Sequence, residues 1–208
     1  VETASKAEKK TFKQKWTGNM KKRHDPTFGE FKDEYTKITF QPDLKKCGMD
    51  SLDPDTVALL SRRAYDVAAS APGVKVYLNG KRIPLKGFKD YVDFMIKGSL
   101  DDTGNQIKAT YEKCGDRWDV AIAPSTDKGF QQMSFVNSIA TTKGGRHVDY
   151  VADMISKQLI EKIKKKNKSG INIKPFQIKN HMWLFINCLI ENPKFSSQTK
   201  EEMTLQIK

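Results

Sequence analysis

The sequence predicts an α+β fold in which one β-sheet is covered by helices. Two observations lead to this prediction. Short segments with alternating or continuous apolar character, typical of strands, recur through the second half of the chain. One long segment among them has apolar residues spaced by three and four, which is typical of an amphipathic helix. The sequence shows no internal repeat.

The N-terminal part predicts strands and turns. Polar and apolar residues alternate over Thr11–Trp16, as expected for a half-exposed strand. Asp25-Pro26 then favours a turn. Tyr35–Phe40 alternates again, and Pro42 ends this second strand.

Two helices and a hairpin are expected in the middle of the chain. Asp53-Pro54 combines an N-cap residue with proline at the first helical position, so a helix begins there and ends before Pro72. Val74–Leu78 followed by Asn79-Gly80 predicts a strand that enters a tight turn. Phe88–Ile96 then predicts a short helix with a mixed apolar face.

The second half predicts the main sheet and its longest helix. Strands are expected at Ile107–Cys114, Trp118–Ala123 and Phe130–Asn137. A glycine pair then precedes a helix that begins near Arg146. Its apolar stripe consists of Val148, Ala152, Ile155, Leu159 and Ile163. The dense apolar run Trp183–Ile190 is rich in β-branched and aromatic residues, which favours a buried strand.

Composition points to an anionic partner. The net charge is +12 and the isoelectric point is about 9.5. Such a charge favours nucleic acid, acidic lipid or nucleotide, although many basic surfaces only confer solubility. Lysine is concentrated between Lys157 and Lys179: this segment contains eight lysines and a single acidic residue, Glu161. This excess is greater than the capping of a helix C-terminus requires.

Several classes of protein are disfavoured. The three cysteines are far apart and the three histidines are scattered, so neither a disulfide framework nor a zinc site is expected. No apolar run reaches the ~18 residues that span a bilayer, and no signal peptide is visible, so we expect no membrane partner. The chain starts at Val1 and not at methionine, and we expect a piece of a longer protein.

Several strings are too particular to be generic. They are SFVNSIATTKGGRHVDY at Ser134–Tyr150, KKKNK at Lys164–Lys168, NHMW at Asn180–Trp183, ENP at Glu191–Pro193 and QTK at Gln198–Lys200. Together they resemble the transducer region of eukaryotic type IIA DNA topoisomerases. The earlier strings VETA, ITFQPD and RRAYD resemble the closing elements of the adjoining GHKL-type ATPase domain.

The resemblance implies two domains and a particular topology. Residues 1–85 would be C-terminal elements of the GHKL ATPase domain, and residues 86–208 would be the transducer domain. In this family the transducer is a four-stranded sheet backed by helices with a left-handed βαβ crossover, like the second domain of a small-subunit ribosomal protein. General chirality rules alone would favour a right-handed crossover.

The resemblance also implies a nucleotide contact. In the family, the loop that matches Gln198, Thr199 and Lys200 reaches the γ-phosphate of ATP. A lysine ammonium and a glutamine amide suit a terminal phosphate because both donate hydrogen bonds. Thr199 is expected to contribute packing or backbone contacts. Glu201 and Glu202 follow directly and are possible partners of Lys200 without nucleotide.

The lysine-rich string has an implied role as well. In the family this loop touches the transported DNA duplex, so Lys164, Lys165, Lys166 and Lys168 are candidate DNA-binding residues. No aromatic or Arg/Asn/Gln recognition pattern accompanies them, which favours phosphate contacts that do not depend on base sequence. The alternative is that they only complement the partial charge at a helix end.

The parent protein is expected to be an ATP-dependent, nuclear, homodimeric topoisomerase that uses Mg²⁺. The family's Mg²⁺ ligand, catalytic glutamate, ATP lid and DNA-cleaving tyrosine have no match in this sequence. We therefore expect no catalytic residue and no turnover from this chain alone. The His147-x-Asp149 pair is read as a structural anchor, because no nucleophile lies nearby.

Two alternatives remain open. One is a stand-alone basic nucleic-acid-binding module, for which QTK would have no role. The other is the equivalent region of another GHKL ATPase, such as a mismatch-repair or chaperone protein.

Overall fold

The computed structural model describes residues 1–101, 103–126, 129–166 and 173–206. They divide into two compact units, Val1–Val57 and Ala58–Lys208. The division into an ATPase part and a transducer part near Lys86 remains a prediction.

The first unit contains a four-stranded antiparallel sheet with the order β5-β2-β1-β6. Its strands are β1 (Glu2–Ser5), β2 (Lys10–Lys13), β5 (Thr27–Glu30) and β6 (Tyr35–Lys37). The segment predicted as one strand at Thr11–Trp16 is interrupted, because β3 (Trp16–Thr17) instead forms a small hairpin with β4 (Lys22–Arg23). A short 3₁₀ helix, η1 (Leu44–Cys47), follows.

This first unit buries very little apolar surface. Ala4 is its only buried hydrophobic residue among those described, whereas Phe28 is 69% exposed and Phe40 is 78% exposed. Large apolar side chains are rarely left so open in a stable sheet, because burial of one face supplies most of its stability. The unit therefore lacks a hydrophobic core of its own.

Helix α1 (Pro54–Ser70) begins where its capping signal predicts. The Asp53 carboxylate accepts a hydrogen bond from the backbone N–H of Thr56 at 2.7 Å, as an N-cap does. The hairpin of β7 (Tyr77–Leu78) and β8 (Lys81–Arg82) turns through Asn79-Gly80. Both turn residues have positive φ, which a two-residue hairpin turn of this kind requires.

The second unit is built around a five-stranded sheet with the order β12-β11-β14-β10-β9. The strands are β9 (Thr110–Cys114), β10 (Trp118–Pro124), β11 (Gln131–Val136), β12 (Ile139–Ala140) and β14 (Met182–Cys188). The expectation of four strands is corrected by β12, a two-residue strand that turns back from β11 at Asn137-Ser138. Strands β11 and β14 are parallel neighbours, and helix α3 (Arg146–Lys166) lies between them in the chain.

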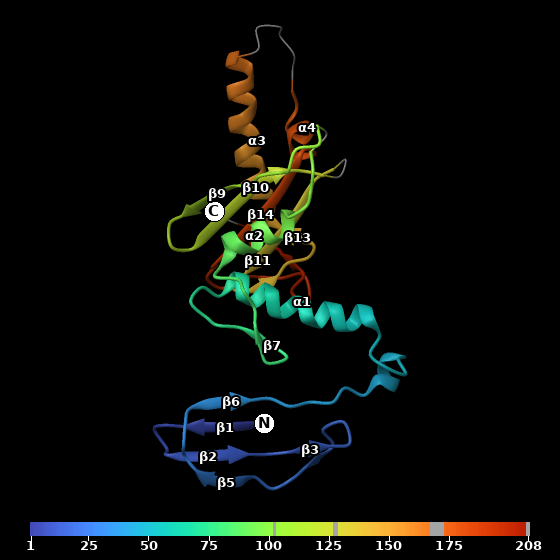
Figure 1. Cartoon of the computed structure of the whole chain (residues 1–208), viewed down its shortest axis with the longest axis vertical. Helices are drawn as coiled ribbons and strands as arrows, with labels where there is room; N and C mark the ends of the chain where they lie inside the picture. Colours follow the sequence, from blue (N-terminus) through green and yellow to red (C-terminus); the bar gives the residue numbers. More distant parts are fainter. Residues whose placement is uncertain (102, 127–128, 167–172, 207–208) are drawn as a thin grey trace. The chain divides into compact units, whose positions relative to one another are not determined.

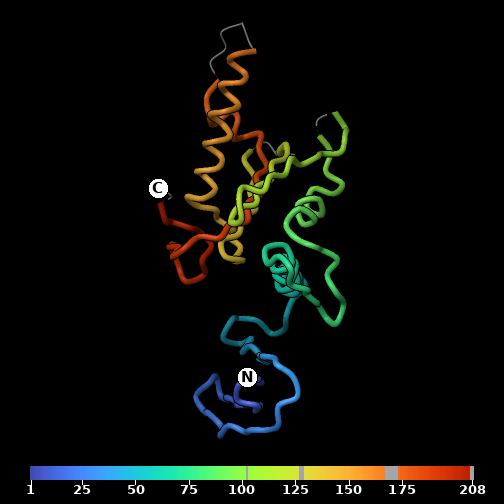
Figure 2. Tube along the Cα trace, turned by 90° about the vertical axis from the view of Figure 1, so that its left-hand side faces the viewer, coloured from blue at the N-terminus to red at the C-terminus, as the bar shows by residue number. Residues whose placement is uncertain are grey.

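Helices cover both faces of this sheet (Figures 1 and 2). Strand β14 is buried along its whole length, and its side chains alternate between two core clusters. Trp183 and Phe185 join the cluster that contains α2 (Phe88–Ile96), and Leu184 and Ile186 join the cluster that contains α3. The predicted α+β class is confirmed: strand alternation places one hydrophobic core on each side of the sheet.

One detail of α3 differs from its predicted stripe. Val148 and Ala152 are buried as expected, but Leu159 is exposed, and the buried line continues through Ser156 and Ile160. Hydropathy alone assigns a serine to the surface. Here the small side chain of Ser156 allows close packing, so the buried line runs in steps of four residues.

Candidate nucleotide-sensing loop and lysine cluster

Residues 194–204 form a loop whose two ends run side by side. Two backbone hydrogen bonds and one bridge join these ends: Thr204 N–H to Lys194 O at 2.8 Å, Ser196 N–H to Glu202 O at 3.1 Å, and Phe195 opposite Met203. Met203 is fully buried in the core on the α3 side of the sheet, and Phe195 packs against the same cluster. The base of the loop is therefore anchored, and its tip carries Gln198, Thr199 and Lys200.

All three residues of the tip are exposed. A tight turn brings them together: the Lys200 N–H donates to the Ser197 carbonyl at 3.1 Å, and Lys200 has a φ of 57°. The Thr199 hydroxyl lies 2.8 Å from the Ser197 hydroxyl. Thr199 thus helps to shape the turn, whereas the side chains of Gln198 and Lys200 form no hydrogen bond with a described residue.

The ammonium group of Lys200 has no acidic partner among the residues that the structure describes. Its Nζ lies 5.8 Å from the centre of the Phe195 ring. A cation–π contact at this distance holds the side chain loosely. The expectation that Glu201 pairs with Lys200 is not met, because Glu201 pairs with Lys143.

Lys143 joins the loop to the segment before α3. Its Nζ lies 2.8 Å from the Glu201 carboxylate, and its N–H donates to the Glu201 carbonyl at 2.9 Å. Next to this pair, β13 (Gly144–Gly145) runs parallel to β15 (Glu202–Met203). This pairing is not predictable from the sequence, because a two-residue glycine strand has no hydropathy pattern.

Three of the four candidate DNA-binding lysines lie in the last turn of α3. Lys164, Lys165 and Lys166 are exposed and form no ion pair with any described residue. Lys168 lies outside the described residues. The three positive charges are thus available to an anionic partner, although they also complement the partial negative charge of the helix end.

The lysine cluster lies at the C-terminal end of α3, whereas the Gln198–Lys200 loop leads into β15, which pairs with β13 directly before the N-terminal end of α3 (Figure 1). Helix α3 spans much of the distance between them. Its 21 residues correspond to roughly 30 Å at 1.5 Å per residue. One small ligand therefore could not reach both candidate sites at once.

The Arg146, His147 and Asp149 cluster does not form a site. His147 is fully buried, and its Nε2 lies 3.1 Å from the Thr141 hydroxyl. Asp149 points elsewhere and pairs with Lys179 at 3.0 Å. The interpretation of this cluster as an anchor at the start of α3 agrees with these contacts.

The burial of His147 predicts a pH dependence of stability. Burial lowers the pKa of His147 to about 4 from an ordinary 6.5, and the charge of Asp149 opposes this shift only in part. As the pH falls, the His147 imidazole binds a proton in the unfolded chain before it does so in the folded chain. The stability of the folded state is therefore fully retained above the pKa of the unfolded chain, and it decreases as the pH falls toward the pKa of the folded chain. The loss amounts to up to about 3 kcal/mol.

Urea unfolding of the chain at pH 7.5 and pH 4.5 measures this effect. The His147→Gln variant should lose less stability between the two pH values than the parent chain. The exposed His181 offers a matched control, since His181→Gln should keep the parent's pH dependence. Equal pH dependence in the parent chain and the His147→Gln variant would contradict the assignment.

A second buried polar network lies between α1 and α2. Asp66 is 2% exposed and accepts hydrogen bonds from the Tyr91 hydroxyl at 2.9 Å and from Arg63 at 3.0 Å. Burial, followed by the charge of Asp66, raises the pKa of Tyr91. This network holds the C-terminal end of α1 against α2 and has a structural role.

Among the described residues, no group of three or more His, Cys, Asp or Glu side chains could hold a metal ion. No helix in the described part of the chain is both long and apolar enough to cross a membrane.

Comparison with known proteins places this chain in a family. The family model described as DNA gyrase B matches residues 87–207. The chain is 61% identical to DNA topoisomerase 2-alpha of Gallus gallus and 61% identical to DNA topoisomerase 2 of Drosophila melanogaster. All of this chain is aligned in each case, but it spans only 13% and 14% of those two relatives.

Solved structures agree with the sequence comparison. The ATPase region of Saccharomyces cerevisiae topoisomerase II matches 99% of this chain with a TM-score of 0.88 and 46% identity. The ATPase and transducer domains of DNA topoisomerase II from Balamuthia mandrillaris match 99% with a TM-score of 0.88 and 40% identity. The chain covers 51% and 52% of those two structures. It belongs to the DNA gyrase B and DNA topoisomerase II family and corresponds to part of the ATPase region.

Proposed function

We propose that this chain couples the nucleotide state of a type IIA DNA topoisomerase to closure of its N-terminal gate and to passage of one duplex through another. The main support for the proposal is the exposed tip of the loop formed by residues 194–204. Lys200 and Gln198 are exposed side chains on a loop with an anchored base, and Lys200 forms no ion pair with a described acid. An exposed ammonium group without an ion-pair partner among the described residues suits an anionic ligand from outside the chain.

The chemistry of the two side chains fits a terminal phosphate. Lysine offers a point charge with three donors, and glutamine adds a directional amide donor. ATP has a γ-phosphate for these groups to hold, and ADP does not. A ligand shifts a conformational equilibrium only if it binds the two states unequally. Lys200 therefore serves as a sensor and an electrostatic stabiliser of the ATP-bound state, and not as a general base.

The lysine cluster supports a second part of the proposal. Three exposed lysines without acidic partners at one helix end suit the phosphates of a DNA duplex, independently of base sequence. Since they lie at the far end of α3 from the loop, both ligands can be bound at once. The unit would then sense nucleotide at one end and transported DNA at the other.

The parent enzyme supplies the remaining parts. We propose that residues 1–85 complete a GHKL ATPase domain and that residues 86–208 form the transducer with its left-handed crossover. The missing hydrophobic core of the first unit, Val1–Val57, supports its assignment to a larger domain, because its exposed aromatic residues need a covering layer. Mg²⁺ would be held by residues outside this chain, and the enzyme would act as a nuclear homodimer.

The similarity to ATPase-region structures over 99% of the chain supports this proposal over a stand-alone nucleic-acid-binding module. It also supports it over a mismatch-repair protein, because the relatives with about 60% identity are DNA topoisomerases.

Hydrogen exchange in the full-length topoisomerase that carries this segment tests the nucleotide contact. The backbone amides of residues 197–200 lie in an exposed turn and should exchange quickly without nucleotide. A non-hydrolysable ATP analogue should slow their exchange, whereas ADP should leave it unchanged, because only the analogue carries a γ-phosphate. Equal protection by both nucleotides would contradict the proposal.

A further inference from the structure

The sequence places two carboxylates directly after the proposed phosphate-binding lysine. Glu201 is the residue next to Lys200, and Glu202 follows it. A free carboxylate on so short a tether competes with a phosphate for the same ammonium group. A sensor built from Lys200 therefore requires that Glu201 be occupied elsewhere.

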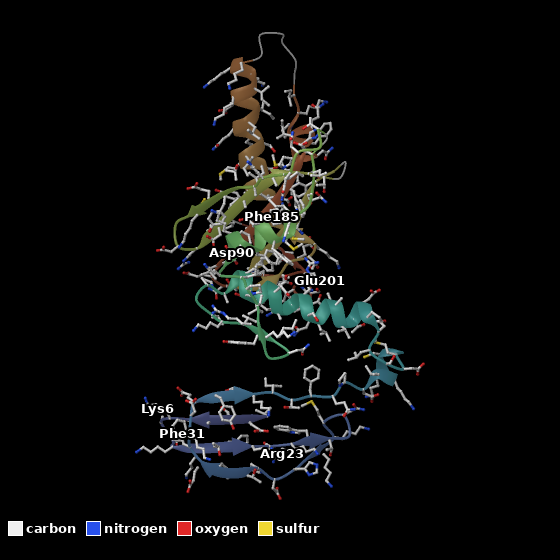
Figure 3. The ribbon with its side chains drawn as sticks, in the orientation of Figure 1. Lys6, Arg23, Phe31, Asp90, Phe185 and Glu201 are labelled. Carbon is white, nitrogen blue, oxygen red and sulfur yellow. The ribbon has the colours of Figure 1, made fainter. Side chains whose placement is uncertain are left out.

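The structure gives Glu201 another partner, Lys143. The ion pair between Lys143 Nζ and the Glu201 carboxylate measures 2.8 Å, and a backbone hydrogen bond of 2.9 Å joins the same two residues. The Lys143 ammonium lowers the pKa of the Glu201 carboxyl, and Glu201 raises the pKa of Lys143. Arg63 on α1 adds a smaller effect on the Glu201 pKa, but its guanidinium is held by Asp66. Figure 3 labels Glu201.

The backbone pairing of β13 with β15 sets the position of Lys143 relative to Glu201. Gly145 approaches the Met203 backbone so closely that an ideal Cβ would clash with it, and its φ is 127°. Only glycine adopts such a conformation without strain. The segment Lys143–Gly145 thus lies alongside the end of the loop. This strand pairing fixes the position of Lys143 next to Glu201.

We propose that Lys143 is a positioning residue that keeps the Glu201 carboxylate away from Lys200 and so leaves Lys200 free for the γ-phosphate. The inference deepens the proposed function and depends on it. Folding stability is a weak alternative explanation of the pair. The Lys143 side chain is 69% exposed and that of Glu201 is 38% exposed, and ion pairs at such exposure contribute little to stability.

Affinity measurements on the full-length topoisomerase that carries this segment test the inference. The dissociation constants for the non-hydrolysable ATP analogue AMPPNP and for ADP are measured for three variants. Lys143→Ala should lower the preference for AMPPNP over ADP roughly threefold, as expected when an exposed ion pair forms with Lys200. The double variant Lys143→Ala/Glu201→Ala should recover the original preference, because the competing carboxylate is gone. Lys143→Arg should behave as the parent enzyme.

Two results would overturn the inference: an unchanged preference in Lys143→Ala, or a double variant as impaired as the single one. The second result would mean that Lys143 acts only through the shape of the loop. Lys200→Ala, measured in parallel, separates this inference from the function on which it rests. If Lys200→Ala lowers the preference and Lys143→Ala does not, only the role of Lys143 fails. If Lys200→Ala has no effect, the sensing function itself fails.

Discussion

Replacing Lys200 with alanine in the full-length topoisomerase should reduce ATP-dependent strand passage about tenfold or more. The substitution would remove the proposed charge-assisted hydrogen bond to the γ-phosphate, worth roughly 1.5–3 kcal/mol. Binding of ATP should weaken less than strand passage, because the contacts to adenine and Mg²⁺ come from other residues. The fold should persist, since Lys200 is exposed and forms no ion pair with any described residue. DNA decatenation at saturating ATP measures the effect.

Lys194 provides a matched control for this variant. It lies at the base of the same loop, is exposed, and contributes its backbone carbonyl and not its side chain to the loop closure. Lys194→Ala should therefore keep strand passage close to that of the parent enzyme. Normal strand passage by Lys200→Ala at saturating ATP would remove the sensor assignment.

Replacing Lys164, Lys165 and Lys166 together with alanine should weaken binding of duplex DNA in a salt-dependent manner. Each lysine that neutralises one phosphate contributes about −0.9 to the slope of log affinity against log salt, so the slope should flatten by up to roughly 2–3 units. The loss should be similar on DNA of unrelated sequence, because phosphates carry no base information. Filter binding or fluorescence anisotropy over a salt series measures the slope.

A charge-matched control separates contact from net charge. Lys89, Lys97 and Lys113 are exposed, form no ion pair with any described residue, and lie outside the α3 end. Their triple replacement by alanine lowers the net charge equally but should leave the salt slope nearly unchanged. In the full-length enzyme, only the α3 variant should lose DNA-stimulated ATPase activity while basal ATPase persists. An unchanged slope in the α3 variant would mean that these lysines are only helix-end charges.

The sequence predicted those elements whose position depends only on neighbouring residues, namely the start of α1 and the β7–β8 hairpin. Asp53-Pro54 located the start of α1 because capping depends on neighbouring residues alone. Asn79-Gly80 located the hairpin for the same reason: positive φ at both positions depends on side-chain type. The bounds of α2 also agree with the predicted Phe88–Ile96. The QTK and KKKNK strings are motifs of the sequence, and the structure adds the exposure of Gln198–Lys200 and of Lys164–Lys166 and the separation of these two groups.

Contacts between distant segments were not predictable in this way. The two-residue strands β12 and β13 have no apolar alternation, and their pairing depends on partners elsewhere in the chain. Lys143 and Glu201 are far apart in the sequence, and no pattern links them. Leu159 was assigned to the buried stripe of α3 because hydropathy does not show that Ser156 occupies the closely packed position.

The central claim is that Lys200 distinguishes ATP from ADP through the γ-phosphate. The most direct test is the ratio of the dissociation constants for AMPPNP and ADP, measured for the full-length topoisomerase and for its Lys200→Ala variant. We expect the variant to lose about threefold to tenfold of its preference for AMPPNP, the equivalent of roughly 0.7–1.4 kcal/mol and a smaller factor than its loss of strand passage, while its affinity for ADP stays the same. An unchanged ratio, or an equal loss of affinity for both nucleotides, would contradict the claim.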